Sequence, residues 1–219
     1  QNGEFTDEYQ SHWTFDEGRG ETVSDALTDS TGEVRGATWT DGIEGGALSF
    51  DGEDDQVVVE NVSREMTGEE SITVGVWVRG NLTAGDANFP HVLRQRGSNG
   101  SQFGVWAREG QGDFGIAMSD TNGTVVRNFG IQQTRFDGWT HIAFVLDRDA
   151  EELRLYHNGS LVSTRDTSVF GSIQDAGPMY IGSDGREQFG AITVDGIQFR
   201  HRALSSEEIE KAANNSVVT

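Results

Sequence analysis

One histidine and the scattered carboxylates are the side chains of this chain that could take part in catalysis. His141 lies in the apolar stretch Trp139–Leu146, and no serine, cysteine or carboxylate stands at a spacing that would complete a catalytic triad with it. We therefore interpret His141 as a structural residue of a strand. Glycoside hydrolysis uses two carboxylates about 5–9 Å apart, and the nearest acidic run, Glu53-Asp54-Asp55, falls in an expected turn before Val57–Val59. The sequence therefore predicts that the protein is not an enzyme, and polysaccharide cleavage is the least favoured function.

Aromatic side chains on strands are better candidates for a functional site. Sugars pack against exposed aromatic rings and need a few converging polar groups. Trp106 in the segment QFGVWARE is such a ring, with Arg108 and Gln102 on adjoining faces as polar partners. Trp39 and Phe89 are further candidates. The alternative for each ring is a place in the hydrophobic core.

The charge of the chain limits its partners. The 219 residues include 36 acidic and 16 basic ones, for a net charge of −20, and they include no cysteine. So negative a surface repels nucleic acid and anionic lipid, and no apolar run is long enough for membrane insertion. Lysine is nearly absent (Lys211 alone), and a dense carboxylate surface is typical of proteins that work in concentrated salt. We expect a halophilic, archaeal protein that is secreted or held at the cell surface.

Glycosylation sequons support an extracellular location. Six Asn-x-Ser/Thr triplets occur, and the expected acceptors are Asn61, Asn81, Asn99, Asn122, Asn158 and Asn214. Three of them read Asn-Gly-Ser/Thr, which is also good turn chemistry, so the alternative is that these are turns without glycans. We predict an extracellular or cell-surface glycoprotein.

Short alternating strands make up most of the chain. Apolar alternation, interrupted by Gly, Asn and Asp, predicts strands at His12–Phe15, Ala47–Phe50, Gln56–Glu60, Ser71–Arg79, His91–Arg96, Gln102–Arg108, Phe114–Met118, Val125–Phe129, Thr140–Leu146, Leu153–Tyr156, Leu161–Arg165, Met179–Ile181 and Ala191–Phe199. No helix separates successive strands, so the pattern favours an all-β, two-sheet antiparallel sandwich. We divide the chain into an N-terminal arm (1–10), one domain (11–213) and a C-terminal tail (214–219).

Three local features refine this sandwich. Ser71–Arg79 and Trp139–Leu146 carry apolar residues on both faces, which is typical of strands covered on both sides. Asn158-Gly159 predicts a type I′ hairpin turn. The segment RALSSEEIEKAANN predicts one short C-terminal helix, with Ser205 or Ser206 as N-cap and Glu208 completing a capping box.

Seven motifs in order resemble a known family. HWTFDEGRG, GGALSFDGEDDQVVV, SITVGVWVR, GWTHIAFVL, LRLYHNGSLV, MYIGSD and AITVDGIQFRHRALSSEEI are similar, in this order, to laminin-G-like jelly-roll domains of the concanavalin A-like lectin and glucanase superfamily. The resemblance covers about Ser11 to Ala213. It implies a jelly roll of two curved sheets with six or seven strands each, and buried positions for Trp13, Trp77 and Trp139. The Glu-x-Asp-x-x-Glu strand of the β-glucanase branch is missing here.

The resemblance also implies a structural calcium ion. Many members hold one calcium at the edge of the sandwich, and the position of its aspartate corresponds to Asp195 in ITVDGIQ. Asp29 in the loop TDSTG and the carbonyl group of Gly46 could supply further oxygens. The alternative is that these carboxylates belong only to a screened acidic surface.

Two classes of function fit these features. We favour an extracellular, non-catalytic binding module for carbohydrate or for cell-surface recognition and adhesion, with a glycan or a surface protein as partner. The alternative is a structural subunit that self-assembles into a filament, a surface layer or a viral spike. In that case the arm Gln1–Gln10 could add as a strand to the sheet of a neighbouring copy.

Overall fold

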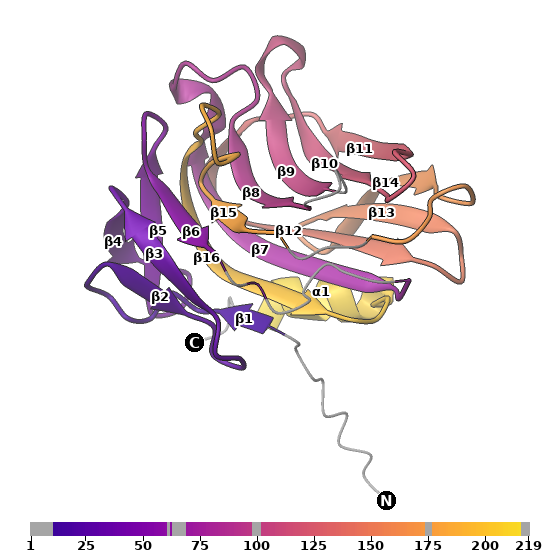
Figure 1. Cartoon of the computed structure of the whole chain (residues 1–219), viewed down its shortest axis with the longest axis horizontal. Helices are drawn as coiled ribbons and strands as arrows, with labels where there is room; N and C mark the ends of the chain where they lie inside the picture. The colour runs from indigo at the N-terminus through magenta and orange to yellow at the C-terminus, as the bar shows by residue number, and fades with distance from the viewer. Residues whose placement is uncertain (1–10, 61, 63–68, 98–101, 174–176, 216–219) are drawn as a thin grey trace, which may run out of the picture.

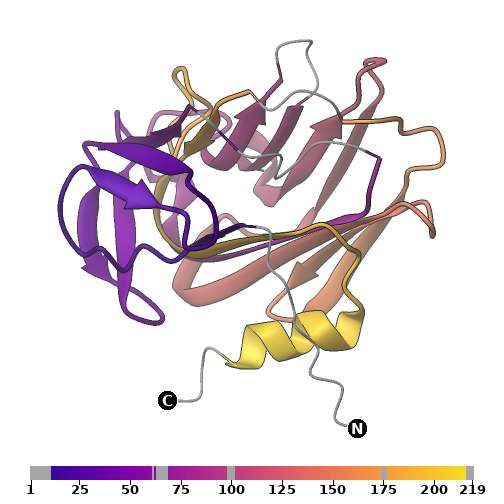
Figure 2. The same cartoon turned by 60° about the horizontal axis from the view of Figure 1, so that its bottom comes forward.

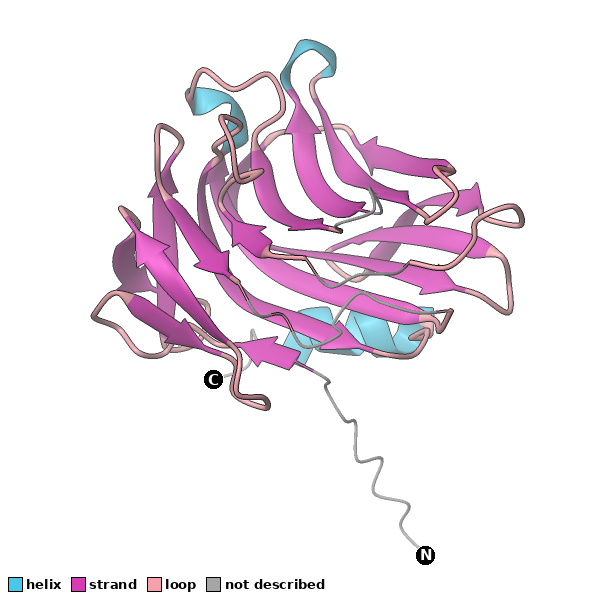
Figure 3. Cartoon of the chain, in the orientation of Figure 1, coloured by secondary structure: helices cyan, strands magenta, loops and turns pink. Residues whose placement is uncertain are grey.

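A computed structural model describes residues 11–60, 62, 69–97, 102–173 and 177–215 (Figure 1). The side chains of Gln102 and Asn215 and the arm Gln1–Gln10 lie outside this described part. Strands dominate it, as Figure 3 shows, and they form two antiparallel sheets of eight strands each. This confirms the predicted all-β jelly-roll sandwich.

The first sheet contains the longest strands. Its strand order is β14 (Ser160–Asp166), β13 (Glu152–His157), β12 (Arg135–Asp147), β7 (Ile72–Asn81), β16 (Ala191–Arg200), β5 (Gly46–Asp51) and β4 (Thr38–Asp41), and β1 (Ser11–Trp13) also pairs with β16.

The second sheet lies across the core from the first. Its strand order is β11 (Val125–Ile131), β10 (Asp113–Ser119), β9 (Gln102–Arg108), β8 (His91–Arg96), β15 (Met179–Ile181), β6 (Gln56–Val59), β3 (Thr31–Arg35) and β2 (Thr22–Ser24). The single-turn helix η1 (Leu82–Ala84) lies between β7 of the first sheet and β8, and η2 (Glu109–Gln111) lies between β9 and β10.

The core lies between the two sheets. Strand alternation turns Phe103 and Phe114 of the second sheet toward the first. Phe103 meets Phe144 with ring centroids 5.0 Å apart, and Phe114 meets Phe136 at 5.6 Å. Burial of apolar side chains, these rings among them, is the dominant favourable contribution to folding.

Helix α1 (Ser206–Asn215) covers the other face of the first sheet, as Figure 2 shows. Ile209 packs with Leu204 against Ala143, Val145 and Tyr156 of that sheet. Strand β12 is therefore buried on both faces, as its sequence predicts.

The predicted cap of α1 is present. The amide of Glu208 donates to Ser205 Oγ over 3.2 Å, and the amide of Ser205 donates to Glu208 Oε2 over 2.8 Å. This reciprocal pair is a capping box with Ser205 at the N-cap. The Asn158-Gly159 turn between β13 and β14 is also confirmed, since both residues have positive φ, 47° and 78°.

Three short strands were missed by the sequence prediction. β2, β3 and β4 contain three to five residues each, and two of them expose alternate residues at the edge of the fold. So short an alternation does not stand out from a loop. With them, each sheet has eight strands instead of the expected six or seven.

The expectation for the tryptophans was right for two and wrong for one. Trp13 is fully buried and Trp77 is 5% exposed. Trp139 is only half-buried, because the register of β12 against β7 shifts between Phe136 and Thr140 and turns its ring to the surface. There the guanidinium of Arg79 lies 4.8 Å from the centre of the indole.

Candidate functional site

The outward face of the second sheet carries the candidate ligand-binding site. Alternation along β9 turns Phe103, Val105 and Ala107 into the core and leaves Trp106 and Arg108 on the outward face. The same face is formed on β8 by His91 and Arg94, because the register pairs His91 with Trp106 and Arg94 with Gly104.

Trp106 is held in place by two other rings. Its indole stacks on the imidazole of His91 with centroids 5.0 Å apart and planes 22° apart. On its other side, Phe129 of β11 lies edge-on at 5.2 Å. The indole is half-buried, so part of it remains accessible on the outward face. The alternative of a core position is wrong for this ring.

A hollow of about 160 Å³ lies beside Trp106. Its lining consists of Arg94, Gly104, Trp106, Ala117, Met118, Ser119, Val125 and Arg127. Small residues make the room: a Cβ on Gly104 would lie 3.0 Å from both the indole and the stem of Arg94. The glycine therefore lets both side chains lie low over the strand.

The other two predicted ligand-binding residues are placed differently. Arg108 lies on the same face as Trp106, not on an adjoining one. Its guanidinium pairs with Asp113 and lies 4.2 Å from the centre of the Phe129 ring, so its charge is already engaged. The backbone of Gln102 pairs with Ser119 and Arg96 at the end of the same strands, and its side chain lies outside the described part.

His91 is the buried polar residue of the site. Its Nδ1 lies 2.6 Å from the carbonyl oxygen of Phe89, and Arg94 reaches its Nε2 over 3.2 Å. This arrangement requires the neutral ring with the proton on Nδ1. Burial, and secondly the cation of Arg94, lower the pKa of His91 to about 3. The ring is therefore an uncharged support for Trp106 at neutral pH.

Among the described residues, no carboxylate lines this hollow. Asp113, on the same face, is bound to Arg108. The acidic run Glu53-Asp54-Asp55 lies in the turn between β5 and β6, where Asp51, Asp54 and Asp55 place their oxygens within 4.8 Å of one another. Asp55 is buried and accepts the amide of Asp51 over 2.9 Å. This contact gives the run a structural role in the turn.

The predicted calcium ligands are brought together in part. The carboxylate of Asp195 is buried and accepts the amides of Ile43 at 2.8 Å and Glu44 at 3.4 Å. Gly46 follows in the same turn, and its amide donates to Asp16 over 2.9 Å. Asp16 is a neighbour that the sequence prediction missed. Asp29 lies exposed in the turn before β3, and no contact in the described part joins it to Asp195.

Oxygens converge at this turn. A Cβ on Gly42 would lie 2.3 Å from the carbonyl oxygen of Gly46, 2.5 Å from Asp195 Oδ2 and 2.7 Å from the carbonyl oxygen of Glu44. Burial raises the pKa of Asp195 to about 6, against the opposing effect of the backbone amides. Carboxylate and carbonyl oxygens are the donors that calcium prefers, so the residues present fit that ion.

The further aromatic candidates lie elsewhere. Trp39 is half-buried and lines an open hollow of about 380 Å³ together with Asp16 and Asp41. Its Nε1 donates to the carbonyl oxygen of Gly20 over 2.9 Å. Phe89 is 49% exposed, in the connection just before β8.

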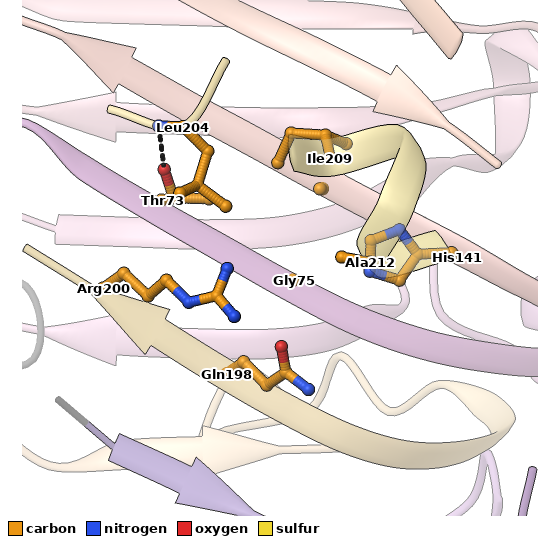
Figure 4. Close-up of a pocket in the computed structure, with 9 residues that line it drawn as sticks. Thr73, Gly75, His141, Gln198, Arg200, Leu204, Ile209 and Ala212 are labelled. Carbon is orange, nitrogen blue, oxygen red and sulfur yellow. Dashed lines mark hydrogen bonds between the residues drawn. The ribbon is translucent and has the colours of Figure 1, made fainter. Parts of the chain in front are cut away.

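His141 lies under α1, away from solvent. Figure 4 shows it in a small gap between the helix and the first sheet, with Gly75, Arg200 and Ala212. Burial, and secondly the charge of Arg200, lower its pKa to about 4. The ring is buried, as a structural residue requires.

The sequons that fall in the described part lie at or near the surface. Asn122, Asn158 and Asn214 are exposed, and Asn81 is half-buried at the end of β7. Asn61 and Asn99 lie outside the described residues. Asn158 uses its Oδ1 to accept the amide of His141 over 2.9 Å, which leaves its side-chain nitrogen for other partners. No helix of the described part is long and apolar enough to span a membrane.

The fold is a two-sheet antiparallel jelly-roll sandwich, and comparison of the sequence with family models agrees with this fold. A laminin-G model described as the concanavalin A-like lectin/glucanases superfamily matches residues 51–210. The match covers well over half of the chain, so the protein belongs to this superfamily. No curated protein matches the chain in sequence.

Several solved structures share the fold. The binding domain of Paraclostridial Mosquitocidal Protein 1 superimposes with a TM-score of 0.75 at 16% identity, covering 95% of this chain and 52% of that one. The botulinum neurotoxin serotype G binding domain gives 0.76 at 14% identity, covering 94% and 50%. The serotype D ligand-binding domain, solved with N-acetylneuraminic acid, gives 0.76 at 15% identity, covering 95% and 51%. The chain thus spans about half the length of these solved chains, and the likeness shows the fold.

Proposed function

We propose that this protein is a non-catalytic binding module that acts outside the cell or at its surface and recognises a glycan or a surface protein. The observation that carries the proposal is the Trp106 hollow: a half-buried indole, fixed by His91 and Phe129, beside the small residues Gly104 and Ala117. A fixed ring next to open space is what a sugar face packs against, because the ring loses little freedom on binding.

Two further observations support a binder over an enzyme. In the part of the chain that the structure describes, the lining of the hollow has no pair of carboxylates that could act as acid and base. The solved structures with the same fold are described as binding domains, and one holds N-acetylneuraminic acid.

The experiment is a glycan array with three forms of the protein. Trp106→Ala removes the ring of the proposed site and should abolish retention of the glycans that the wild type captures. Trp139→Ala is the matched control, because it removes another half-buried indole from the opposite sheet. Circular dichroism checks that both variants keep their strands. A wild type that captures no glycan and no surface protein, or a Trp106→Ala variant that binds like the wild type, contradicts the proposal.

A structural calcium ion belongs to the same proposal. Asp195, Asp16 and the carbonyl group of Gly46 would hold it at the turn between β4 and β5. When bound, the ion supplies positive charge that offsets the burial of the Asp195 carboxylate. The chain itself positions these oxygens through Gly42, which has no side chain to separate them.

Self-assembly is a second candidate function, favoured by one observation. Leu161 and Val162 are 48% and 40% exposed, and they are neighbours on β14, the last strand in the order of the first sheet. Exposed apolar side chains on an edge strand favour pairing with another chain. Light scattering in concentrated salt separates the candidates, since a monomer supports the binding module and a regular polymer supports the assembly.

The native setting that we propose is extracellular and rich in salt. The sequon asparagines Asn122, Asn158 and Asn214 are exposed at the surface, and the chain carries a net charge of −20. Intact mass of protein purified from its source tests glycosylation. Unfolding measured at rising salt concentration tests the halophilic character, which predicts a marked gain in stability as self-repulsion is screened.

A further inference from the structure

A row of four residues crosses the hollow from strand to strand. The register pairs Arg94 of β8 with Gly104 of β9, Gly104 with Ala117 of β10, and Ala117 with Arg127 of β11. All four line the hollow. Neighbouring strands are about 4.8 Å apart, so the two arginine backbones stand roughly 14 Å apart across three such intervals. Between the two arginines the row has only Gly104 and Ala117, whose side chains are no larger than a methyl group.

The charge of this row is opposite to that of the protein. Acidic residues outnumber basic ones 36 to 16 in the chain, yet the described lining of the hollow has two arginines and no carboxylate. Arg127 is exposed, and no carboxylate of the described residues pairs with it. Arg96 of β8 lies near Arg94, but its charge is already paired with Asp184, which accepts from it over 3.0 Å, so the cations of the hollow itself are Arg94 and Arg127. The hollow is a local positive site on an acidic molecule.

Arg94 lies close to Trp106 and keeps its positive charge there. The stem of Arg94 lies over Gly104, and its guanidinium is 6.0 Å from the centre of the Trp106 ring. Burial, and secondly the charge of Arg96, lower the pKa of Arg94 to about 10, which leaves the side chain cationic at neutral pH. A bound anion would relieve the repulsion between these cations.

The combination of ring and cations identifies a class of ligand. Guanidinium groups bind carboxylate and sulfate through paired hydrogen bonds, and an indole offers a surface for the apolar face of a sugar ring. We propose that the Trp106 hollow takes an acidic saccharide, bearing uronate or sulfate groups, whose anionic groups are held by Arg94 and Arg127. This inference rests on the proposed function of the same site. The net charge of −20 repels polyanions at long range, so recognition depends on contact inside the hollow.

The test compares charged and uncharged saccharides by calorimetry at about 1 M salt, where screening over about 3 Å removes the long-range repulsion. The probes are polygalacturonate fragments for carboxylate, dextran sulfate fragments for sulfate, and uncharged dextran. The variants are Arg127→Gln, Arg94→Gln and the matched control Arg165→Gln, which removes an exposed arginine from β14. We expect Arg127→Gln to weaken binding of an acidic probe about tenfold or more, as loss of a charged hydrogen bond does, and Arg165→Gln to leave it unchanged.

The outcomes separate this inference from the proposed function. Binding of the carboxylated or of the sulfated probe, lost in Arg127→Gln, supports the inference and tells which group is recognised. Binding of dextran as tight as that of both acidic probes, still lost in Trp106→Ala, overturns the inference and leaves the binding module intact. A single-stranded oligonucleotide that binds more tightly than any saccharide overturns the inference as well. Absence of binding to every probe and to every glycan of the array overturns both.

Discussion

Replacement of His91 by glutamine tests the physical account of the site. His91 is 3% exposed, and its pKa in the folded protein is lowered from 6.5 to about 3. In the unfolded chain His91 binds a proton near pH 6.5, whereas in the folded chain it stays neutral until the pH falls to about 3. The stability contributed by the neutral ring is therefore fully present above pH 6.5 and is lost as the pH falls toward 3. At pH 5, which is 1.5 units below 6.5, the loss is about 2 kcal/mol, because one unit corresponds to about 1.4 kcal/mol.

The assay is urea unfolding at pH 7 and pH 5 at constant ionic strength. The wild type should lose about 2 kcal/mol more than His91→Gln over this interval. His141, whose pKa is lowered to about 4, should behave in the same way when it is replaced by glutamine. From pH 7 to pH 5 the free energy of unfolding of the double variant His91→Gln, His141→Gln should fall by about 4 kcal/mol less than that of the wild type, because the effects of separate sites add. Equal pH dependence in wild type and His91→Gln, or a native His91 ring that titrates near pH 6.5 by NMR, would refute the reasoning.

Two further predictions concern the first sheet and the proposed calcium site at the turn between β4 and β5. Ile209→Ala should lower the free energy of unfolding by about 2–4 kcal/mol, because it opens a cavity under α1 in a fully covered cluster, and urea unfolding measures this loss. Asp195→Asn should raise the melting temperature in chelator at pH 7, because the raised pKa of Asp195 means that folding loses stability as the pH rises from about 4 to 6. The same variant should abolish the rise in melting temperature that calcium gives the wild type, and a wild type whose melt is equal in calcium and chelator would contradict the calcium proposal.

The sequence predicts the architecture well because strand alternation is a local signal. The two-sided burial of β7 and β12, the Asn158-Gly159 turn and the capping box of α1 each depend on residues close together in the chain. The short strands β2 and β3 were missed because their alternation is too brief to rise above that of a loop.

The candidate site could be predicted only in part. Trp106 is an aromatic residue on an expected strand, so its type and place identify it as a candidate. His91 and Phe129, which fix its ring, come from strands on either side of β9 and β10, and nothing in their local sequence reveals the pairing. A signal was available in Gly104, since a glycine inside a strand often marks a close approach of other groups.

The sequence by itself therefore determined the class of fold, the acidic character of the protein and the presence of an aromatic residue, Trp106, on a strand. Only the tertiary structure decided that Arg94 and Arg127 stand at the two ends of one row, because the register of four strands sets that distance and no local pattern encodes it. The same holds for Trp139, whose place at the surface follows from a shift in pairing with β7. The sequence gives the type of each side chain, but which side chains form one site depends on which strands lie side by side.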